Sequence, residues 1–172
     1  NSFESAMKLS AMAADDPVAA ERELRASGRF TVPEVWYQQP LYYKANRFSV
    51  AESGKDVVWP AYSEVMDFEL EMACIVGKKG KDISKVNAED HIFGYTIYND
   101  FSARDAQILE SPGMLGPAKS KDFEDSIILG PVIVTKDELD DPYSLRMQAR
   151  VNGETWCDSN SSTIHWKFSD MI

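Results

Sequence analysis

Two glutamates, Glu69 and Glu71, interrupt a segment whose other residues have the composition of a buried β-strand, residues 67–77. Side chains two positions apart in a strand point to the same face, so these two carboxylates should lie side by side. The same face continues with Ala73 and Ile75, which favour burial. Paired carboxylates on an apolar face repel each other and are costly to desolvate, and a bound cation offsets both effects. The pattern therefore indicates a cation site, with a half-exposed strand as the alternative.

Asp100 is a third candidate ligand. It follows a segment rich in β-branched and aromatic residues, 92–99, and it precedes residues 102–105, which have the form of a helix-capping box with Ser102 as the cap. A capping role for Asp100 is the alternative interpretation. Three carboxylates without a neighbouring Cys or His suit a hard divalent cation better than Zn²⁺. We therefore expect Mg²⁺, or else Mn²⁺ or Ca²⁺.

The elements that must position these residues are short. Residues 17–27 predict a helix, with Asp16 as its N-cap and Gly28 as its stop. Strands are expected over 41–44, 129–135 and 145–151, with Asn152-Gly153 as a hairpin turn after the last, and a helical turn over 86–91. Many strands separated by short helices indicate an α+β, mostly β fold.

Composition excludes several classes of protein. The chain of 172 residues has a net charge of −10, which disfavours binding to the phosphates of nucleic acid. No apolar run approaches the length of about 20 residues that crosses a membrane. Cys74 and Cys157 have no CxxC spacing, so we expect reduced thiols and a cytoplasmic protein. The chain begins at Asn1 without Met and ends in an apolar-rich run, so we expect a fragment of a longer protein.

Several motifs in this chain resemble the fumarylacetoacetate hydrolase family over roughly residues 40–170. The longest motif, residues 99–107, has the form Asn-Asp-x-Ser-Ala-Arg-Asp-x-Gln and is highly specific. The others are Asp67-Phe68-Glu69-Leu70-Glu71, Phe93-Gly94-Tyr95, Lys121-Asp122-Phe123 and Leu129-Gly130-Pro131.

The resemblance implies a mixed β-sandwich roll that assembles as a homodimer. It implies that Glu69, Glu71 and Asp100 bind a divalent metal, that Lys121 is a catalytic residue beside it, and that Gln107 contacts substrate. We also expect Arg104 to bind a substrate carboxylate, with pairing to an acid of its own helix as the alternative. For Lys121 the alternative is an ordinary surface lysine.

By the same resemblance the substrate is a small 2-oxo or β-diketo acid, cleaved by a C–C hydrolase or decarboxylase through a metal-stabilised enolate. An isomerase or hydratase of aromatic-catabolism intermediates, or a non-catalytic metal-binding paralogue, are the alternatives. Hydrolytic members use a His–Glu pair near the N-terminus, whereas no histidine precedes His91 here. Ser111 stands where fumarylacetoacetate hydrolase itself has a substrate-contacting tyrosine, which argues against that enzyme's own substrate.

Two parts of the chain are expected to differ in role. Residues 1–40 form an N-terminal lid-like segment, and residues 41–172 form the catalytic core, incomplete at its C-terminus because the family's later glycine-rich loop lies beyond Ile172. Within the first part, residues 16–36 have few side chains that can anchor a core. We expect them to close over substrate and to bring Glu21, Glu23 or Glu34 toward the metal. A fixed helix on the outside of the fold is the alternative.

Overall fold

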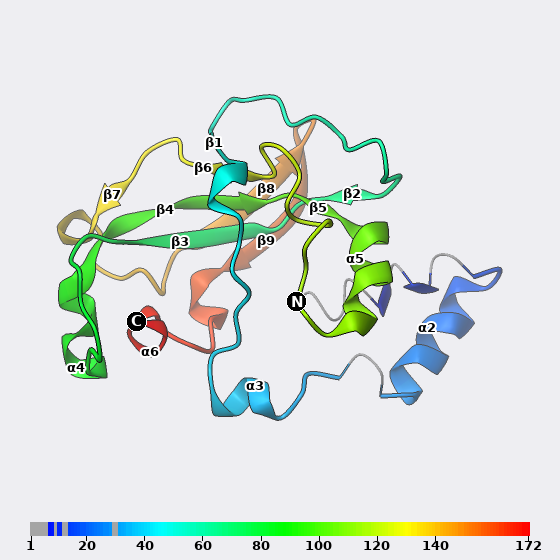
Figure 1. Cartoon of the computed structure of the whole chain (residues 1–172), viewed down its shortest axis with the longest axis horizontal. Coiled ribbons are helices and arrows are strands. Elements are labelled where there is room, and N and C mark those ends of the chain that lie inside the picture. Colours follow the sequence, from blue (N-terminus) through cyan, green and yellow to red (C-terminus); the bar gives the residue numbers. More distant parts are fainter. Residues whose placement is uncertain (1–6, 9, 12–13, 29–30) are drawn as a thin grey trace. The chain divides into compact units, whose positions relative to one another are not determined.

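A computed structural model describes residues 7–8, 10–11, 14–28 and 31–172. The chain divides into two compact units, an N-terminal unit of residues 1–42 and a C-terminal unit of residues 43–172. Parts of the predicted lid-like segment, namely residues 1–6, 9, 12–13 and 29–30, lie outside the described residues. Figure 1 shows the elements of both units.

The N-terminal unit contains helices α2 (Pro17–Ala26) and α3 (Val35–Gln38). The predicted cap of α2 is confirmed, because a carboxylate oxygen of Asp16 accepts hydrogen bonds of 3.1 Å from the backbone N–H groups of Val18 and Ala19. The strand expected over residues 41–44 is wrong. The chain there forms no ladder, since β-propensity without a neighbouring strand does not make one.

The main sheet of the C-terminal unit has the strand order β1-β6-β4-β3, with β7 also paired to β4. Strands β1 and β6 run parallel, and the other pairs are antiparallel. The members of this sheet are β1 (Val50–Glu52), β3 (Leu70–Val76), β4 (Ile92–Asp100), β6 (Ile127–Leu129) and β7 (Val134–Thr135). The predicted strand over 92–99 is thus confirmed and becomes the centre of the sheet.

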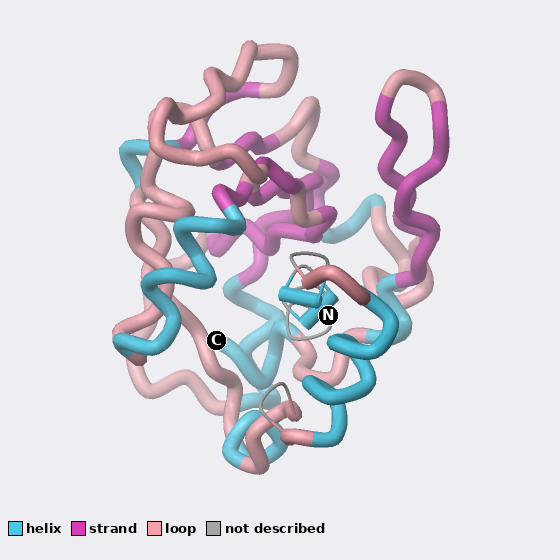
Figure 2. The backbone as a smooth tube through the Cα atoms, turned by 90° about the vertical axis from the view of Figure 1, so that its right-hand side faces the viewer, coloured by secondary structure: helices cyan, strands magenta, loops and turns pink. Residues whose placement is uncertain are grey.

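Two small sheets accompany it. Strands β2 (Met66–Asp67) and β5 (Ser102–Ala103) pair antiparallel, and β8 (Arg146–Val151) pairs with β9 (Glu154–Asn160). The expected hairpin turn is confirmed, because Asn152 and Gly153, both with positive φ, join β8 to β9. Figure 2 shows this hairpin standing to one side of the larger group of strands.

Two strand predictions need correction. The strand expected over 129–135 is split into β6 and β7, because Gly130 turns the chain with a φ of 118° and Pro131 has no N–H to donate to a ladder. The segment 67–77 is likewise interrupted at Phe68 and Glu69, so that Glu69 lies just before β3.

The helices of the C-terminal unit are short. They are α4 (Lys85–Ala88), α5 (Arg104–Glu110) and α6 (Phe168–Met171), with 3₁₀ turns at Arg47–Ser49, Glu89–His91, Ser111–Gly113, Lys136–Glu138 and Ser161–Thr163. The predicted turn over 86–91 is confirmed by α4 and the 3₁₀ turn that follows it. The predicted cap of α5 is wrong, because Ala103 holds the cap position and Ser102 belongs to β5. No helix in the described part of the chain is both long and apolar enough to cross a bilayer.

The two faces of the β3–β4 ladder have opposite characters. On one face, Tyr95 and Ile92 pack with Phe168, and Met72 and Cys74 of β3 join this core. Because side chains alternate along a strand, Glu71 of β3 lies on the other face. The sheet therefore separates the apolar core from the carboxylates.

Candidate metal and substrate site

The strand register brings the three predicted ligands together. Glu69 and Asp100 exchange two backbone hydrogen bonds of 3.1 Å, so they lie directly opposite each other. Glu71 lies opposite Tyr98, two residues along the same face. Ligand oxygens of Glu69, Glu71 and Asp100 all lie within 4.8 Å of one another. The β3–β4 ladder and the Glu69–Asp100 backbone pair that precedes it therefore bring the three carboxylates together.

The two carboxylate oxygens of Asp100 have different surroundings. The residue is 2% exposed. Its Oδ2 accepts hydrogen bonds from the Tyr43 hydroxyl at 2.5 Å and from Lys121 Nζ at 2.9 Å, whereas its Oδ1 is buried and has no hydrogen-bond partner among the described residues. A buried, unpartnered carboxylate oxygen is costly. A divalent cation between the three carboxylates would give this oxygen its missing partner, so the donor set fits such an ion.

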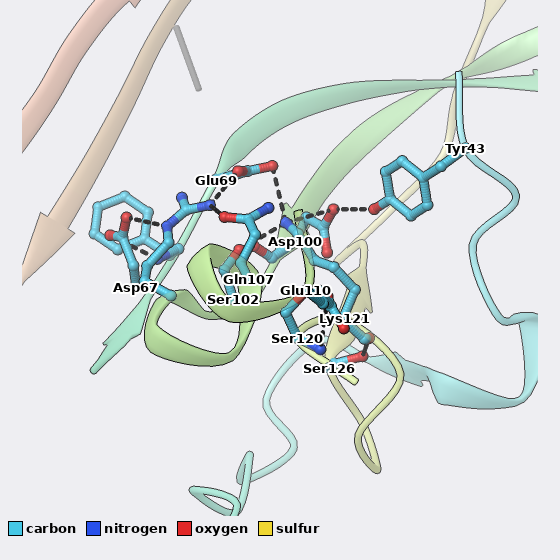
Figure 3. A network of polar contacts seen from close by, with 12 residues as sticks. Tyr43, Asp67, Glu69, Asp100, Ser102, Gln107, Glu110, Ser120, Lys121 and Ser126 are labelled. Carbon is cyan, nitrogen blue, oxygen red and sulfur yellow. Dashed lines mark hydrogen bonds and ion pairs between the residues drawn. The ribbon is translucent and has the colours of Figure 1, made fainter. Parts of the chain in front are cut away.

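The Lys121 side chain is buried beside the three carboxylates. It is 3% exposed, and its Nζ lies 3.0 Å from Glu69 Oε2, 2.9 Å from Asp100 Oδ2 and 2.6 Å from Ser102 Oγ. These three contacts use all three protons of the ammonium group. The surface-lysine alternative is therefore wrong, and Figure 3 shows Lys121 reaching into the polar network.

Arg104, at the start of α5, holds Glu69 from the other side. Its guanidinium donates to Asp67 at 2.8 Å, to Glu69 Oε1 at 2.7 Å and to the side-chain oxygen of Gln107 at 2.9 Å. Arg104 is 4% exposed. Its acidic partners are Asp67 of β2 and Glu69, just before β3, so the alternative of pairing with an acid of its own helix is wrong. The structure brings Arg104 and Gln107 to the cluster, and their contact with a substrate stays a prediction.

The charges of the cluster are unevenly compensated. Burial raises the pKa of Glu69, but Lys121 and Arg104 outweigh this effect and hold it below its usual value. Glu71 is exposed as a residue, but protein atoms surround its carboxyl group. This burial raises the pKa of Glu71 to about 7, and the negative charges of Glu69 and Asp100 add to the effect. The cluster therefore holds more negative charge than its two cationic side chains neutralise, which favours the binding of a further cation.

Sequence reasoning missed three residues of this network. Tyr43 left no signal, because it belongs to none of the motifs and lies 57 residues from Asp100 in the sequence. Ser102 was interpreted as a helix cap, but its hydroxyl donates to the backbone oxygen of Asp100 at 3.1 Å and accepts from Lys121. Glu110 follows Arg104 and Gln107 at intervals of three, a helical spacing that could have revealed it.

Each of the two histidines has a described contact outside the cluster. His91 is buried, with its Nδ1 2.9 Å from the backbone oxygen of Lys78. His165 packs edge-on against Trp166 at 4.9 Å between ring centroids.

The sequence of this chain is similar to those of proteins of one known family. The family model of the fumarylacetoacetate hydrolase C-terminal region matches residues 15–172. The mitochondrial oxaloacetate tautomerase FAHD2A of Homo sapiens is 36% identical over 137 residues, which cover 78% of this chain and 42% of that protein. The oxaloacetate tautomerase YisK of Bacillus subtilis is 34% identical over 138 residues, which cover 78% of this chain and 44% of that protein. The chain thus spans less than half the length of these relatives.

Solved structures share the fold. The 2-hydroxyhepta-2,4-diene-1,7-dioate isomerase of Mycobacterium marinum superposes with a TM-score of 0.69 at 30% identity, over 77% of this chain and 50% of that one. The fumarylpyruvate hydrolase of Pseudomonas aeruginosa, solved with Mn²⁺ and pyruvate, gives a TM-score of 0.71 at 22% identity, over 78% of this chain and 59% of that one. The expected mixed fold is confirmed, and the chain belongs to the fumarylacetoacetate hydrolase family.

Proposed function

We propose that this protein is a divalent-metal-dependent enzyme that interconverts the keto and enol forms of a small 2-oxo dicarboxylic acid of the oxaloacetate type. The carrying observation is the cluster of Glu69, Glu71 and the buried Asp100. One oxygen of Asp100 has no hydrogen-bond partner among the described residues, and the buried ammonium group of Lys121 lies beside it. A 2-oxo acid offers a carboxylate and a keto oxygen, the two groups that such a site accepts when a cation is bound.

The residues around the cluster have separate tasks in this proposal. A divalent cation held by the three carboxylates would supply positive charge to the keto and carboxylate oxygens of the substrate. Lys121, whose side chain is buried, adds a fixed positive charge where the enol oxygen gains negative charge. Arg104 holds Glu69 in place, so that the ligand does not turn away from the cluster.

Gln107 is suited to orient the substrate. Its side-chain oxygen already accepts from Arg104, which leaves its amide N–H groups as the donors for an oxygen of the 2-oxo acid. Figure 3 shows Gln107 between Glu69 and Lys121, on the side of α5 that faces the cluster.

A chemical argument and a comparison favour tautomerisation over C–C hydrolysis. It moves a proton between carbon and oxygen and consumes no water, so the site need not activate a water molecule. The relatives that are 34–36% identical to this chain include oxaloacetate tautomerases from Homo sapiens and Bacillus subtilis. The C–C hydrolase or decarboxylase expected from the sequence stays a prediction, and the isomerase alternative is chemically close to our proposal.

A substrate panel tests the proposal. The protein is loaded with Mg²⁺ or Mn²⁺ and given the enol form of oxaloacetate, an acylpyruvate, or a hydroxymuconate-type acid. We expect rapid loss of the enol absorbance of oxaloacetate without release of CO₂. Because free metal ions also catalyse this conversion, metal alone and the Asp100→Asn variant serve as controls.

Other outcomes would contradict the proposal in distinct ways. Release of CO₂ from oxaloacetate would identify a decarboxylase, and cleavage of the acylpyruvate would identify a hydrolase. Tight metal binding without turnover of any of the three acids would favour the non-catalytic paralogue.

A further inference from the structure

A second carboxylate site lies at the far end of α5 and has no part in the metal cluster. There Glu110 accepts hydrogen bonds from three consecutive backbone N–H groups, those of Ala118 at 2.9 Å, Lys119 at 3.1 Å and Ser120 at 3.3 Å. The hydroxyl of Ser120 donates a fourth. One half-buried side chain thus accepts hydrogen bonds from three consecutive backbone N–H groups of this loop.

We call these four hydrogen bonds from residues 118–120 to Glu110 the clamp. The clamp depends on the negative charge of Glu110. Burial raises the pKa of Glu110, but the hydrogen bonds from Ser120 and from the backbone of residues 118–120 outweigh it and lower the pKa below its usual value. A carboxylate offers acceptors on both oxygens, whereas a glutamine offers one oxygen and places an N–H₂ group against a donor. Glu110→Gln therefore keeps the size of the side chain but breaks the clamp on one side.

The clamped segment leads directly into Lys121. The backbone oxygen of Ser120 accepts from the N–H of Ala103 at 2.9 Å, and Ser126 donates to the backbone oxygen of Lys121. Ser120 and Ser126 are fully buried. The position of the Lys121 ammonium is therefore set by a backbone that Glu110 holds in place.

Helix α5 connects the clamp to the cation ligands. Arg104, Gln107 and Glu110 follow one another at intervals of three residues, so they lie on one side of the helix. Arg104 at the first position bonds Glu69, and Glu110 at the last position bonds the loop of Lys121 (Figure 3). This short helix therefore fixes the separation between a cation ligand and the lysine.

From this geometry we infer that Glu110 is a positioning residue for Lys121, acting through the backbone of residues 118–120. Its kinetic consequence depends on the function proposed above, whereas its structural consequence does not. A displacement of a catalytic group by about 1 Å lowers turnover by about 100-fold. The competing view is that Glu110 only stabilises the loop, in which case melting temperature changes and the lysine does not.

The test compares Glu110→Gln with Glu124→Gln, an exposed glutamate of the loop that follows Lys121. The first readout is NMR of protein labelled with ¹⁵N in its lysines, because a buried, hydrogen-bonded ammonium exchanges its protons slowly and gives a signal. The Lys121→Met variant assigns that signal by its loss. We expect Glu110→Gln to weaken or shift the signal and Glu124→Gln to leave it unchanged.

The second readout is kinetic, at a temperature well below the melting point of every variant. We expect the kcat of Glu110→Gln to fall by about 100-fold, with the Kd for Mn²⁺ changed by less than about 3-fold, because the clamp touches no cation ligand. If Glu110→Gln does not fold, Ser120→Ala, which removes one of the four bonds, takes its place with a smaller effect of the same kind.

The outcomes separate the two proposals. An unchanged lysine signal, or a kcat within about 2-fold of the parent protein, overturns the positioning role of Glu110 even if the melting temperature falls. If the parent protein turns over no substrate, the proposed function fails, and the lysine signal alone then decides for or against the clamp.

Discussion

Replacing Lys121 by methionine tests the site most directly, because this substitution removes the charge and keeps much of the volume. In the metal-free protein the change leaves Asp100 with its hydrogen bond from Tyr43 and leaves Glu69 with its ion pair to Arg104. Removing one member of a buried ion pair costs about 3–5 kcal/mol. Both carboxylates keep a partner here, so we expect the lower value, about 3 kcal/mol.

That loss converts to a shift in melting temperature. A domain of this size loses about 2–4 °C for each kcal/mol, so metal-free Lys121→Met should melt about 6–12 °C below the parent protein. Added Mn²⁺ should raise the melting temperature of the variant at least as much as that of the parent, because the ion replaces the missing positive charge. At 100 times its Kd, the ion contributes about 2.7 kcal/mol.

Turnover should respond differently from metal binding. Loss of a donor that stabilises a developing oxyanion lowers kcat by about 100–1000-fold, whereas the affinity for Mn²⁺ should stay equal or increase, since a competing charge has gone. Calorimetric titration with Mn²⁺, thermal melts and initial rates provide the three measurements. Lys81→Met, at an exposed position, is the matched control. Near-normal kcat for Lys121→Met, or a melting shift no larger than that of Lys81→Met, would refute the reasoning.

Three further predictions follow from the cluster and from α2. The Glu69→Gln, Glu71→Gln double variant should lose the rise in melting temperature that Mn²⁺ gives the parent; an equal rise in both would reject the ligand assignment. Because the pKa of Glu71 is raised to about 7 in the folded state, folding favours its protonated form, and metal-free stability should fall as pH rises from about 4.5 past 7. The melting temperature of Glu71→Gln relative to the parent, measured with a chelator present, should therefore increase across this range; a constant difference would contradict the shift. Hydrogen exchange of residues 16–36 should slow when oxalate, a mimic of the enol acid, binds the metal-loaded protein, and equal exchange in both states would mean that this segment is no lid.

The sequence alone predicted the three carboxylates that the structure brings together. The i, i+2 spacing of Glu69 and Glu71 required a shared face, and the hydrophobic pattern placed Asp100 at the end of a strand. The cap of α2 and the β8–β9 turn were also predictable, because both depend on local hydrogen bonds or on backbone angles of a few neighbouring residues.

Tertiary structure decided how these residues meet. Local rules made Ser102 a helix cap and left Lys121 an ordinary lysine, whereas long-range packing joined them, burying the ammonium against Ser102, Glu69 and Asp100. The pairing of Glu69 with Asp100 depends on strand register, which is set by contacts between segments separated by 30 intervening residues and not by either segment alone. Tyr43 lies 57 residues from Asp100 and reaches it only through the fold. Sequence spacing thus specifies which side chains share an element, but only the packing of elements specifies which side chains share a site.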